Sequence, residues 1–410
     1  MPIIQPFQGF RYDAAKIGSL SRVVTPPYDV ISPEAQLRYY HRHPQNFIRV
    51  VYGRGYRSDA RGRDRYSRAR RTLGQWIRQE ILRQDPEPSV YPYLQEYPLG
   101  DRRHRRWGVI ALVRLDSPRI YPHEEIREGP KQDRLRLMEA VGASLSQIFG
   151  LIPDLSGRYQ GMISSACRAR RPVAVAHLER VKHSLWRISD PAWIARLQQL
   201  LRPKELLIAD GHHRFEAAVA YRNRRRKQEP IFNPSAPYNF SMFYLAAAGP
   251  REPGLLPTHR LLKRFPPDRR RRLLEGGLAP CSVRPTANLE DLVARLERLQ
   301  ARGRLGVGLY TGNGGYLLEP LRPAPNRLDV EWLHREILPR CAGSEPELSY
   351  TQDLAEACRR LREKKAQALF VLRPFPLRAV LERARRGPRL PRKTTYFYPK
   401  PLAGLVEYKF

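Results

Sequence analysis

The chain has 410 residues, of which 41% are hydrophobic and 28% are charged, and its formal net charge at pH 7 is +34. This length favours two or three domains, and because no run of about 18 apolar residues occurs, a membrane-spanning helix is excluded. The four cysteines are scattered without a C-x-x-C pair, which argues against a disulfide framework or a zinc cluster. We therefore expect a cytoplasmic protein with neither a signal peptide nor a membrane partner.

The N-terminal part of the chain alternates helices and strands. A charged, glycine-rich loop is predicted over 52–65, and apolar residues then recur at helical spacing. The later segments include two strands around a turn, a helix after Gly129-Pro130, a buried strand and a hairpin. The expected helices span 66–82, 133–141, 190–201 and 212–222, and the expected strands span 90–97, 106–115, 146–152, 172–179, 181–189 and 204–209.

After about residue 250 the pattern is again mixed. Helices are predicted over 288–303, 351–365 and 376–387, and strands over 304–312, 314–321 and 366–373. The fold class is therefore α/β or mixed α+β, with mixed sheets and flanking helices. We expect an N-terminal α/β portion over 1–255, a C-terminal α/β portion over 256–390, and a tail over 391–410. Because this tail is rich in aromatic residues, we expect it to pack back on the body.

The large positive charge has two interpretations. A charge of this size is typical of nucleic-acid binding. However, Arg supplies most of the 74 basic residues and is spread along the whole chain, which indicates a general composition bias instead of a binding surface. No recognised nucleic-acid-binding module accompanies the charge. We expect non-specific adhesion to nucleic acid and keep specific recognition as an alternative. Because this chain uses Arg for most of its positive charges, each remaining Lys becomes a somewhat better candidate for a functional role that needs a compact ammonium group.

The segment LLIADGHHRFEAA, residues 206–218, is the main candidate site. Here a strand ends at Asp210 and Gly211, directly before the N-terminus of a helix. Such a helix N-terminus can bind an anion, because its first N–H groups have no helical partner and the helix dipole is positive there. Arg214 could fork onto phosphate, and His212 and His213 could donate to it or act as acid or base. Asp210 would repel phosphate unless it bound Mg²⁺, took a proton or only capped the helix.

Three further clusters carry charged residues. The segment YPHEEIREGPKQDRL, 121–135, offers Glu124 as a general base and Lys131 as a phosphate ligand. The segment LPTHRLL, 256–262, carries His259, and PRKTTYFYPKPLAG near the C-terminus carries Lys400. Each cluster also has an ordinary structural interpretation, as a helix start, a loop carboxylate or a packed tail.

These clusters, in this order, resemble one bacterial and archaeal family, known as domain of unknown function 1015. The resemblance extends over essentially the whole chain. The chain departs from the pattern at Ile126, where the family commonly has Thr, and at SLSQ, 144–147, where it has Asn-x-Ser-Pro. The matching segments are PPYDV at 26–30, PHE at 122–124, GPKQDRL at 129–135, IFGL at 148–151, ADGHHRFE at 209–216, LPTHR at 256–260 and the run from Lys393 to Lys400.

The Asp-Gly-His-His-Arg turn also resembles that of free serine kinases in the ParB and sulfiredoxin superfamily. This second resemblance implies a ParB/sulfiredoxin-like element around 120–225, ATP or ADP as cofactor with Mg²⁺ held by Asp210, and a small hydroxylated substrate for which serine is one candidate. On this basis we expect a phosphotransferase. The phosphate-binding residues would be Lys131, Gly211, His213, Arg214, His259 and Lys400, and the catalytic residues would be Glu124, Asp210 and His212.

Two other functions fit the same residues. A phosphatase or other hydrolase of a phosphorylated metabolite would use the same anion site with water as the nucleophile. A nucleotide-gated nucleic-acid-binding module would use the positive charge, although no helix-turn-helix pattern stands out.

Overall fold

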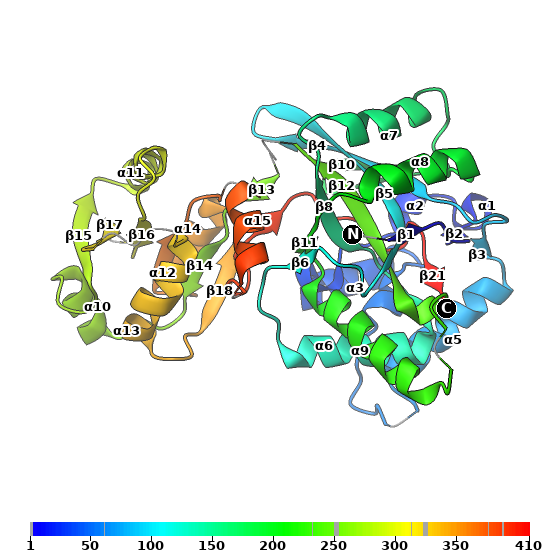
Figure 1. Cartoon of the computed structure of the whole chain (residues 1–410). Coiled ribbons are helices and arrows are strands. Elements are labelled where there is room, and N and C mark those ends of the chain that lie inside the picture. The colour runs from blue at the N-terminus through cyan, green and yellow to red at the C-terminus, as the bar shows by residue number, and fades with distance from the viewer. Residues whose placement is uncertain are drawn as a thin grey trace. The chain divides into compact units, whose positions relative to one another are not determined.

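A computed structural model describes residues 3–60, 62–231, 233–249, 254–312, 314–322, 327–375, 377–387 and 389–410. Arg61 of the predicted loop 52–65 and Pro376 of the predicted helix 376–387 lie outside these ranges. The chain forms two compact units (Figure 1). Unit 1 comprises Met1–Pro253 and Pro399–Phe410, and unit 2 comprises Gly254–Tyr398. The two units are described separately below.

Unit 1 is built on a nine-stranded mixed sheet with the order β6-β11-β8-β12-β5-β4-β10-β9, in which β1 pairs with β5. β11 is parallel to β6 and antiparallel to β8, and β12 is parallel to β8. The strands of this sheet are β1 (Ile4–Gln5), β4 (Tyr91–Leu99), β5 (Arg102–Arg114), β6 (Ile120–Pro122), β8 (Ile148–Pro153), β9 (Ala174–Leu178), β10 (Val181–Leu185), β11 (Leu206–Asp210) and β12 (Phe240–Ala248).

The other elements of unit 1 are helices and short strand pairs. Two helices start as local chemistry predicts: Asp64 caps α5 through the amides of Tyr66 and Ser67, and Asp190 caps α8, whose first residue is Pro191. Strand β2 pairs with β3, and β21 with β7. The helices are α1 (Ala14–Ile17), α2 (Leu20–Val23), η1 (Tyr28–Val30), α3 (Pro33–Arg42), α4 (Ile48–Val51), α5 (Arg65–Arg78), α6 (Glu128–Val141), α7 (Arg158–Arg168), α8 (Pro191–Leu201), α9 (His212–Gln228) and η2 (Pro237–Asn239), and the short strands are β2 (Phe10–Tyr12), β3 (Leu82–Gln84), β7 (Ala143–Ser144) and β21 (Tyr408–Lys409).

One face of this sheet is apolar. Alternate residues of β5, β8 and β12 pack there against α7, α8 and the start of α9 in one buried cluster, which includes Val109, Ile148, Phe243, Trp193 and Phe215. Side chains of successive strand residues point to opposite faces, so the residues between them belong to the other face. The apolar face is the main core of unit 1.

The other face is polar and aromatic, and the C-terminal segment crosses it. The Arg106 guanidinium donates to the carbonyl of Pro399 at 3.1 Å, and the Gln95 amide donates to the carbonyl of Lys400 at 3.1 Å. The backbone N–H of Leu402 donates to the hydroxyl of Tyr93 at 3.4 Å. Residues 399–410 are therefore held by buried polar groups of the sheet.

Acid should weaken unit 1 through this polar face. Burial lowers the pKa of His183 to about 3, and its Nδ1 lies 2.6 Å from the Tyr93 hydroxyl. Between the ordinary pKa of 6.5 and this value, the unfolded chain binds a proton that the folded chain does not. The free energy of unfolding should therefore fall with decreasing pH, by up to about 1.4 kcal/mol per pH unit from this group. Urea denaturation at several pH values gives the free energy of unfolding as a function of pH. For H183Q this free energy should change less with pH than for the wild type, and an unchanged pH dependence would contradict the assignment.

Unit 2 contains a six-stranded antiparallel sheet with the order β15-β17-β16-β19-β14-β18 and a separate pair of β13 with β20. Its strands are β13 (Leu255–Leu256), β14 (His259–Leu262), β15 (Cys281–Thr286), β16 (Val307–Tyr310), β17 (Gly315–Pro320), β18 (Leu348–Thr351), β19 (Ala368–Val371) and β20 (Tyr396–Phe397). Its helices are α10 (Pro267–Leu274), α11 (Leu289–Ala301), α12 (Asp329–Trp332), the π-helix η3 (Leu333–Ile337), α13 (Leu338–Ala342), α14 (Leu354–Arg362) and α15 (Leu377–Arg386).

Both faces of the unit 2 sheet are covered. In β19, Leu369 and Val371 pack with α11 and α14, whereas Ala368 and Phe370 pack with α10, α12, η3 and α13. Because successive side chains of a strand point to opposite faces of the sheet, the sheet lies between two layers of helices. The predicted fold class, α/β with mixed sheets and flanking helices, is confirmed. Among the described residues, no helix combines the length and the apolar character needed to cross a bilayer.

Candidate functional site

The predicted turn lies at the end of a fully buried strand. All residues of β11 are buried, and the pairing of β11 with β8 shifts register between Ile208 and Asp210. Such a bulge re-aims the side chains beyond it. Gly211 then adopts the left-handed conformation, with φ 90° and ψ 28°, and α9 begins at His212 with no side-chain cap. The sequence therefore places a carboxylate and an uncapped helix start at one point in unit 1.

Asp210 lies between two cations. Its Oδ2 accepts a hydrogen bond from Arg214 Nη2 at 2.7 Å, and its Oδ1 is ion-paired with the Lys400 ammonium. The three side chains are about nine-tenths buried, with exposed fractions of 12% for Asp210 and 8% for each cation. Two positive charges and one negative charge leave a sum of +1 in this cluster. The α9 dipole adds a further positive contribution.

Arg214 has a second set of contacts on the β7–β8 turn. Its Nη1 donates to the carbonyl of Gln147 and to Ser146 Oγ, the latter at 3.3 Å. A Cβ at position 211 would lie 2.9 Å from Nε and Nη2 of Arg214. Any other residue at 211 would therefore push the guanidinium aside and would also strain the positive φ. Gly211 is needed both for the turn and for the position of Arg214.

The two adjacent histidines hold a loop. Nε2 of His212 accepts the backbone N–H of His123 at 3.3 Å, and Nε2 of His213 accepts the backbone N–H of Arg127 at 3.0 Å. Because Nε2 accepts in each ring, the proton of the neutral ring is on Nδ1. Both rings thus attach the loop 123–127 to the start of α9, while the catalytic role of His212 and the phosphate-binding role of His213 stay predictions. While they do so, Nε2 cannot donate to a phosphate.

Glu124 is the carboxylate that this loop carries. Its side chain is 13% exposed, and Oε1 lies 3.7 Å from Nε2 of His123. Burial lowers the pKa of His123, which Glu124 partly opposes. A neutral His123 places no positive charge beside Glu124. His123 also packs edge-on against His212, with ring centroids 4.8 Å apart.

Lys131 lies in the first turn of α6. Its Nζ is 3.3 Å from Glu128 Oε2, and its side chain is 24% exposed. An exposed i,i+3 pair of this kind is a helix-surface feature. Among the interactions of the described residues, none joins Lys131 to Asp210 or Arg214. Its predicted role as a phosphate ligand therefore stays a prediction.

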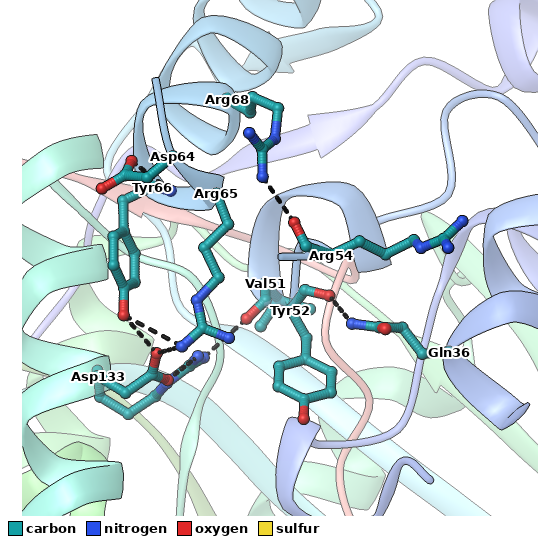
Figure 2. Close-up of polar contacts among 10 residues, drawn as sticks. Gln36, Val51, Tyr52, Arg54, Asp64, Arg65, Tyr66, Arg68 and Asp133 are labelled. Carbon is teal, nitrogen blue, oxygen red and sulfur yellow. Dashed lines mark hydrogen bonds and ion pairs between the residues drawn. The ribbon is translucent and has the colours of Figure 1, made fainter. Parts of the chain in front are cut away.

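A second charged cluster joins α5 to α6 (Figure 2). The Arg65 guanidinium and the Tyr66 hydroxyl both donate to Asp133 Oδ1, the hydroxyl at 2.7 Å. Arg134 Nε donates to Asp133 Oδ2 at 2.9 Å, and its Nη1 donates to the carbonyl of Val51 at 2.7 Å. Two guanidiniums and one carboxylate again sum to +1.

Tyr28 of the predicted PPYDV segment lies against this cluster. The Arg134 guanidinium lies over its ring, 3.9 Å from the centroid. Burial raises the pKa of Tyr28 to about 12, while Arg134 and Arg214 act to lower it. The N-terminal segment, the start of α6, the turn at 210–214 and the C-terminal segment thus meet in one region of unit 1.

His259 belongs to unit 2 and is buried there. Its Nδ1 accepts the backbone N–H of Leu372 at 3.2 Å, and burial lowers its pKa to about 4. The neighbouring Arg260 donates to Nε2 of His334 in the π-helix η3 at 3.3 Å. The participation of His259 in the site at the turn stays a prediction.

The residues around Asp210 do not fit a magnesium ion. Magnesium requires oxygen ligands in near-octahedral geometry, but each oxygen of Asp210 already faces a cation. Within the described ranges, no three His, Cys, Asp or Glu side chains gather closely enough to hold a metal. In this arrangement Asp210 anchors Arg214 and Lys400, and its role as a metal ligand stays a prediction.

The sequence analysis did not single out several residues of this region. Gln147 is fully buried, and neither polar atom of its side chain has a hydrogen-bond partner, while its carbonyl binds Arg214. Arg65 and Tyr66 are also part of the charged network. A lone Gln or Tyr carries no sequence signal of its own, so only the three-dimensional contacts reveal these residues.

Comparison with solved structures finds chains of low similarity. They include a conserved hypothetical protein from Pyrococcus furiosus, with 14% identity and a TM-score of 0.36 over 71% of this chain and 93% of that chain. A free serine kinase in complex with AMP has 14% identity and a TM-score of 0.37 over 70% and 86%. SbnI with a C-terminal truncation from Staphylococcus aureus has 11% identity and a TM-score of 0.38 over 72% and 85%. We draw no conclusion about activity from similarity at this level.

A comparison with curated proteins gives no match. A family model does match, and it spans residues 4–334 of the 410. Because this model covers most of the chain, the resemblance seen in the sequence motifs is confirmed at the level of the family: the chain belongs to the family described as protein of unknown function, DUF1015.

Proposed function

We propose that this protein is a phosphotransferase that binds the phosphates of ATP or ADP at the turn 210–214 and transfers a phosphoryl group to a small hydroxylated metabolite. The observation that carries the proposal is the buried cluster of Lys400, Asp210 and Arg214 at the uncapped start of α9. Its surplus positive charge lies where the backbone N–H groups of the first helical turn have no helical partner.

Phosphoryl transfer depends mainly on positioning and on charge stabilisation. Arg214 and Lys400 are fixed by Asp210, so their charges need no reorganisation when a phosphate binds. The amides that follow Gly211 would donate to the same phosphate oxygens. Anchoring by Asp210 thus explains why a carboxylate is present at a site for an anion.

Glu124 is the proposed proton acceptor. The acceptor hydroxyl oxygen forms a bond to the terminal phosphorus, the bond from that phosphorus to the bridging oxygen breaks, and the hydroxyl proton passes to Glu124. The histidines at 212 and 213 attach the loop of Glu124 to the helix start. A displacement of this loop would therefore lower the rate without removing the phosphate site.

Three finer assignments belong to the same proposal. Serine remains a candidate substrate, residues 120–225 remain a candidate ParB/sulfiredoxin-like element, and the nucleotide remains the candidate phosphate donor. A hydrolase would use the same cations with water in place of the hydroxyl. Glu124 could accept a proton from a substrate hydroxyl or from water. The reaction with labelled nucleotide therefore decides between a kinase and a hydrolase.

Calorimetric titration of ATP and ADP tests the phosphate site. We expect saturable binding by the wild type and a loss of about 10- to 100-fold in affinity for K400Q, because a charge-assisted hydrogen bond contributes about 1.5–3 kcal/mol. The matched control R202Q changes an exposed arginine of the same unit and should bind like the wild type. E124Q should keep its affinity and lose turnover.

Activity is measured with labelled ATP and a pool of hydroxylated metabolites that includes serine. Transfer of the label to a metabolite supports a kinase, and release of phosphate from phosphorylated metabolites without nucleotide supports the hydrolase. All titrations need a series of salt concentrations, since binding driven only by the net charge falls steeply with salt. Equal nucleotide affinity in the wild type, K400Q and R202Q would overturn the proposal.

A further inference from the structure

Two hairpin turns of the unit 1 sheet border a groove with a volume of about 680 Å³. The turn Gly100-Asp101 joins β4 to β5, and the turn Glu179-Arg180 joins β9 to β10. Both turns lie at the same end of the sheet, because β4 and β10 are neighbouring antiparallel strands. Among the described residues that line this groove, none belongs to the nucleotide site proposed above.

The lining of this groove is mainly cationic. Its basic side chains are those of Arg102, Arg103, Arg180 and Lys182. The Lys182 ammonium is 3.3 Å from Glu96 Oε2, and Asp101 also lines the groove. The three arginines are exposed, and no hydrogen bond or ion pair to another described residue uses their guanidiniums. Three guanidinium groups therefore remain for an anionic ligand.

The turn between β9 and β10 has a backbone conformation that its residues disfavour. Glu179 and Arg180 have positive φ angles, of 49° and 65°. A two-residue hairpin turn with two such angles usually carries Asn-Gly, and the neighbouring turn does place Gly100 at its φ of 57°. Strained residues of this kind gather at functional sites. Here the strained residue Arg180 lines the groove.

A second groove, with a volume of about 740 Å³, adjoins the first at His177, which lines both. The rings of His41 and His177 are exposed there. Arg38 and Arg42 of α3 add two cations to its wall, and Glu179 adds one carboxylate. The two grooves thus form one surface on which exposed rings follow a cationic stretch.

The composition of this surface indicates the class of partner. Charged residues are depleted at the centre of protein–protein interfaces, whereas interfaces with nucleic acid are much more positively charged. A guanidinium fork matches the oxygens of a phosphate. Aromatic and imidazole rings stack on bases, which are accessible for stacking only where the strand is unpaired.

We propose that the two grooves bind single-stranded nucleic acid, with its phosphates on Arg102, Arg103 and Arg180 and its bases on His41 and His177. Phosphate contacts carry no sequence information, so this binding has no strong sequence preference. It depends on these positions and not on the net charge alone. The inference holds whether or not the protein is a phosphotransferase.

The experiment follows the fluorescence anisotropy of a labelled oligothymidylate with the full-length protein at several salt concentrations. The variant R102Q/R103Q/R180Q should lose about tenfold or more in affinity, and its salt dependence should fall by about 2 in log–log slope, since each phosphate contact on a single strand contributes about 0.7. The matched control R70Q/R71Q/R78Q removes three exposed arginines of α5 and the same net charge. Its affinity should change by less than about twofold.

Two further variants test the rings and the turn. H41A/H177A should lose about fivefold or more in affinity for oligothymidylate but keep its affinity for inorganic polyphosphate, which has no bases. R180G removes a cation and relieves a positive φ. Its midpoint of thermal unfolding should therefore rise while its affinity for oligothymidylate falls. An unchanged affinity in R180G would contradict the role of the turn.

Nucleotide titration separates this surface from the site at 210–214. R102Q/R103Q/R180Q should bind ATP and ADP like the wild type, whereas K400Q should bind oligothymidylate like the wild type. Failure of one proposal is therefore visible without failure of the other. Circular dichroism checks the fold of each variant, and the single variants R102Q and R103Q replace the triple variant if it does not fold.

Three results would overturn the inference. The first is an equal loss of affinity in the groove variant and in the α5 control, which would assign the binding to the net charge of +34. The second is binding of a duplex as tight as that of the single strand, which would exclude stacking on bases. The third is equally tight binding of polyglutamate, which would identify an acidic protein segment as the partner.

Discussion

Replacing Asp210 with Asn is expected to lower the free energy of unfolding of unit 1 by about 3–5 kcal/mol, because two buried cations then lose their shared carboxylate. The side chains of Arg214 and Lys400 are each 8% exposed, so water cannot replace the lost contact. Urea denaturation followed by circular dichroism measures the change. The control E139Q breaks a partly exposed pair with Arg224 and should cost less than about 1 kcal/mol.

The same variant has a second expected behaviour. With Asp210 neutral, the charge of the cluster rises from +1 to +2, and an added polyphosphate or phosphate ion should restore part of the lost stability. We therefore expect the midpoint of thermal unfolding to rise more for D210N than for the wild type when phosphate is added. A D210N protein as stable as the wild type, with no added response to phosphate, would show that the carboxylate does not hold the two cations.

In unit 2, the variant R373M should also lose about 3–5 kcal/mol. Arg373 and Asp329 are buried, with side-chain exposed fractions of 8% and 4%. Arg373 Nε and Nη2 donate to the two oxygens of Asp329 at 2.8 Å and 2.7 Å. Methionine has a similar volume but leaves Asp329 without its cation. The exchange rate of the amide hydrogens of β19 reports on unit 2 alone.

The pH dependence of R373M provides an independent check. Burial raises the pKa of Asp329, and Arg373 opposes this rise. Without Arg373 the pKa of the folded form should rise further, so the folded variant binds a proton that the unfolded chain releases. The destabilisation should therefore shrink as the pH falls towards the ordinary carboxyl pKa of about 3.9. The control R378M changes an exposed arginine, and a similar loss in both variants would refute the expected role of the buried pair.

Elements with a strong local signal were predictable. The helices that begin after Asp190 and Asn288 have an N-cap, a regular apolar spacing and a defined end, and they occur close to the predicted positions. The helix α6 begins at Glu128, before Gly129-Pro130, because proline is tolerated in a first turn whose N–H groups have no helical partner.

Strand β12 was not predicted, although it lies within the sheet of unit 1. All nine of its residues, FSMFYLAAA, are buried, so the alternation of polar and apolar residues that identifies a half-exposed strand is missing. Its position depends on pairing with β5 and β8, which are distant in the sequence. Strand order of this kind is a property of the whole sheet.

The residue types of the turn were apparent from the sequence, but their partners were not. Pairing of Lys400 with Asp210 joins residues 190 positions apart, and no local pattern predicts such a contact. The same limit applies to His212 and His213, whose acceptor role depends on the backbone of a loop 86 or more positions away. Sequence motifs identify reactive groups, whereas their protonation and roles depend on the fold.

The path of the C-terminal segment has a consequence for synthesis. Residues 399–410 belong to unit 1, yet the ribosome makes them after all of unit 2. Until they emerge, Tyr93, Gln95 and Arg106 lack the backbone partners that they have in the finished protein. Unit 1 therefore cannot finish folding during translation as an N-terminal domain usually does. A nascent chain halted before Pro399 would expose the uncovered polar and aromatic face of the sheet to chaperones.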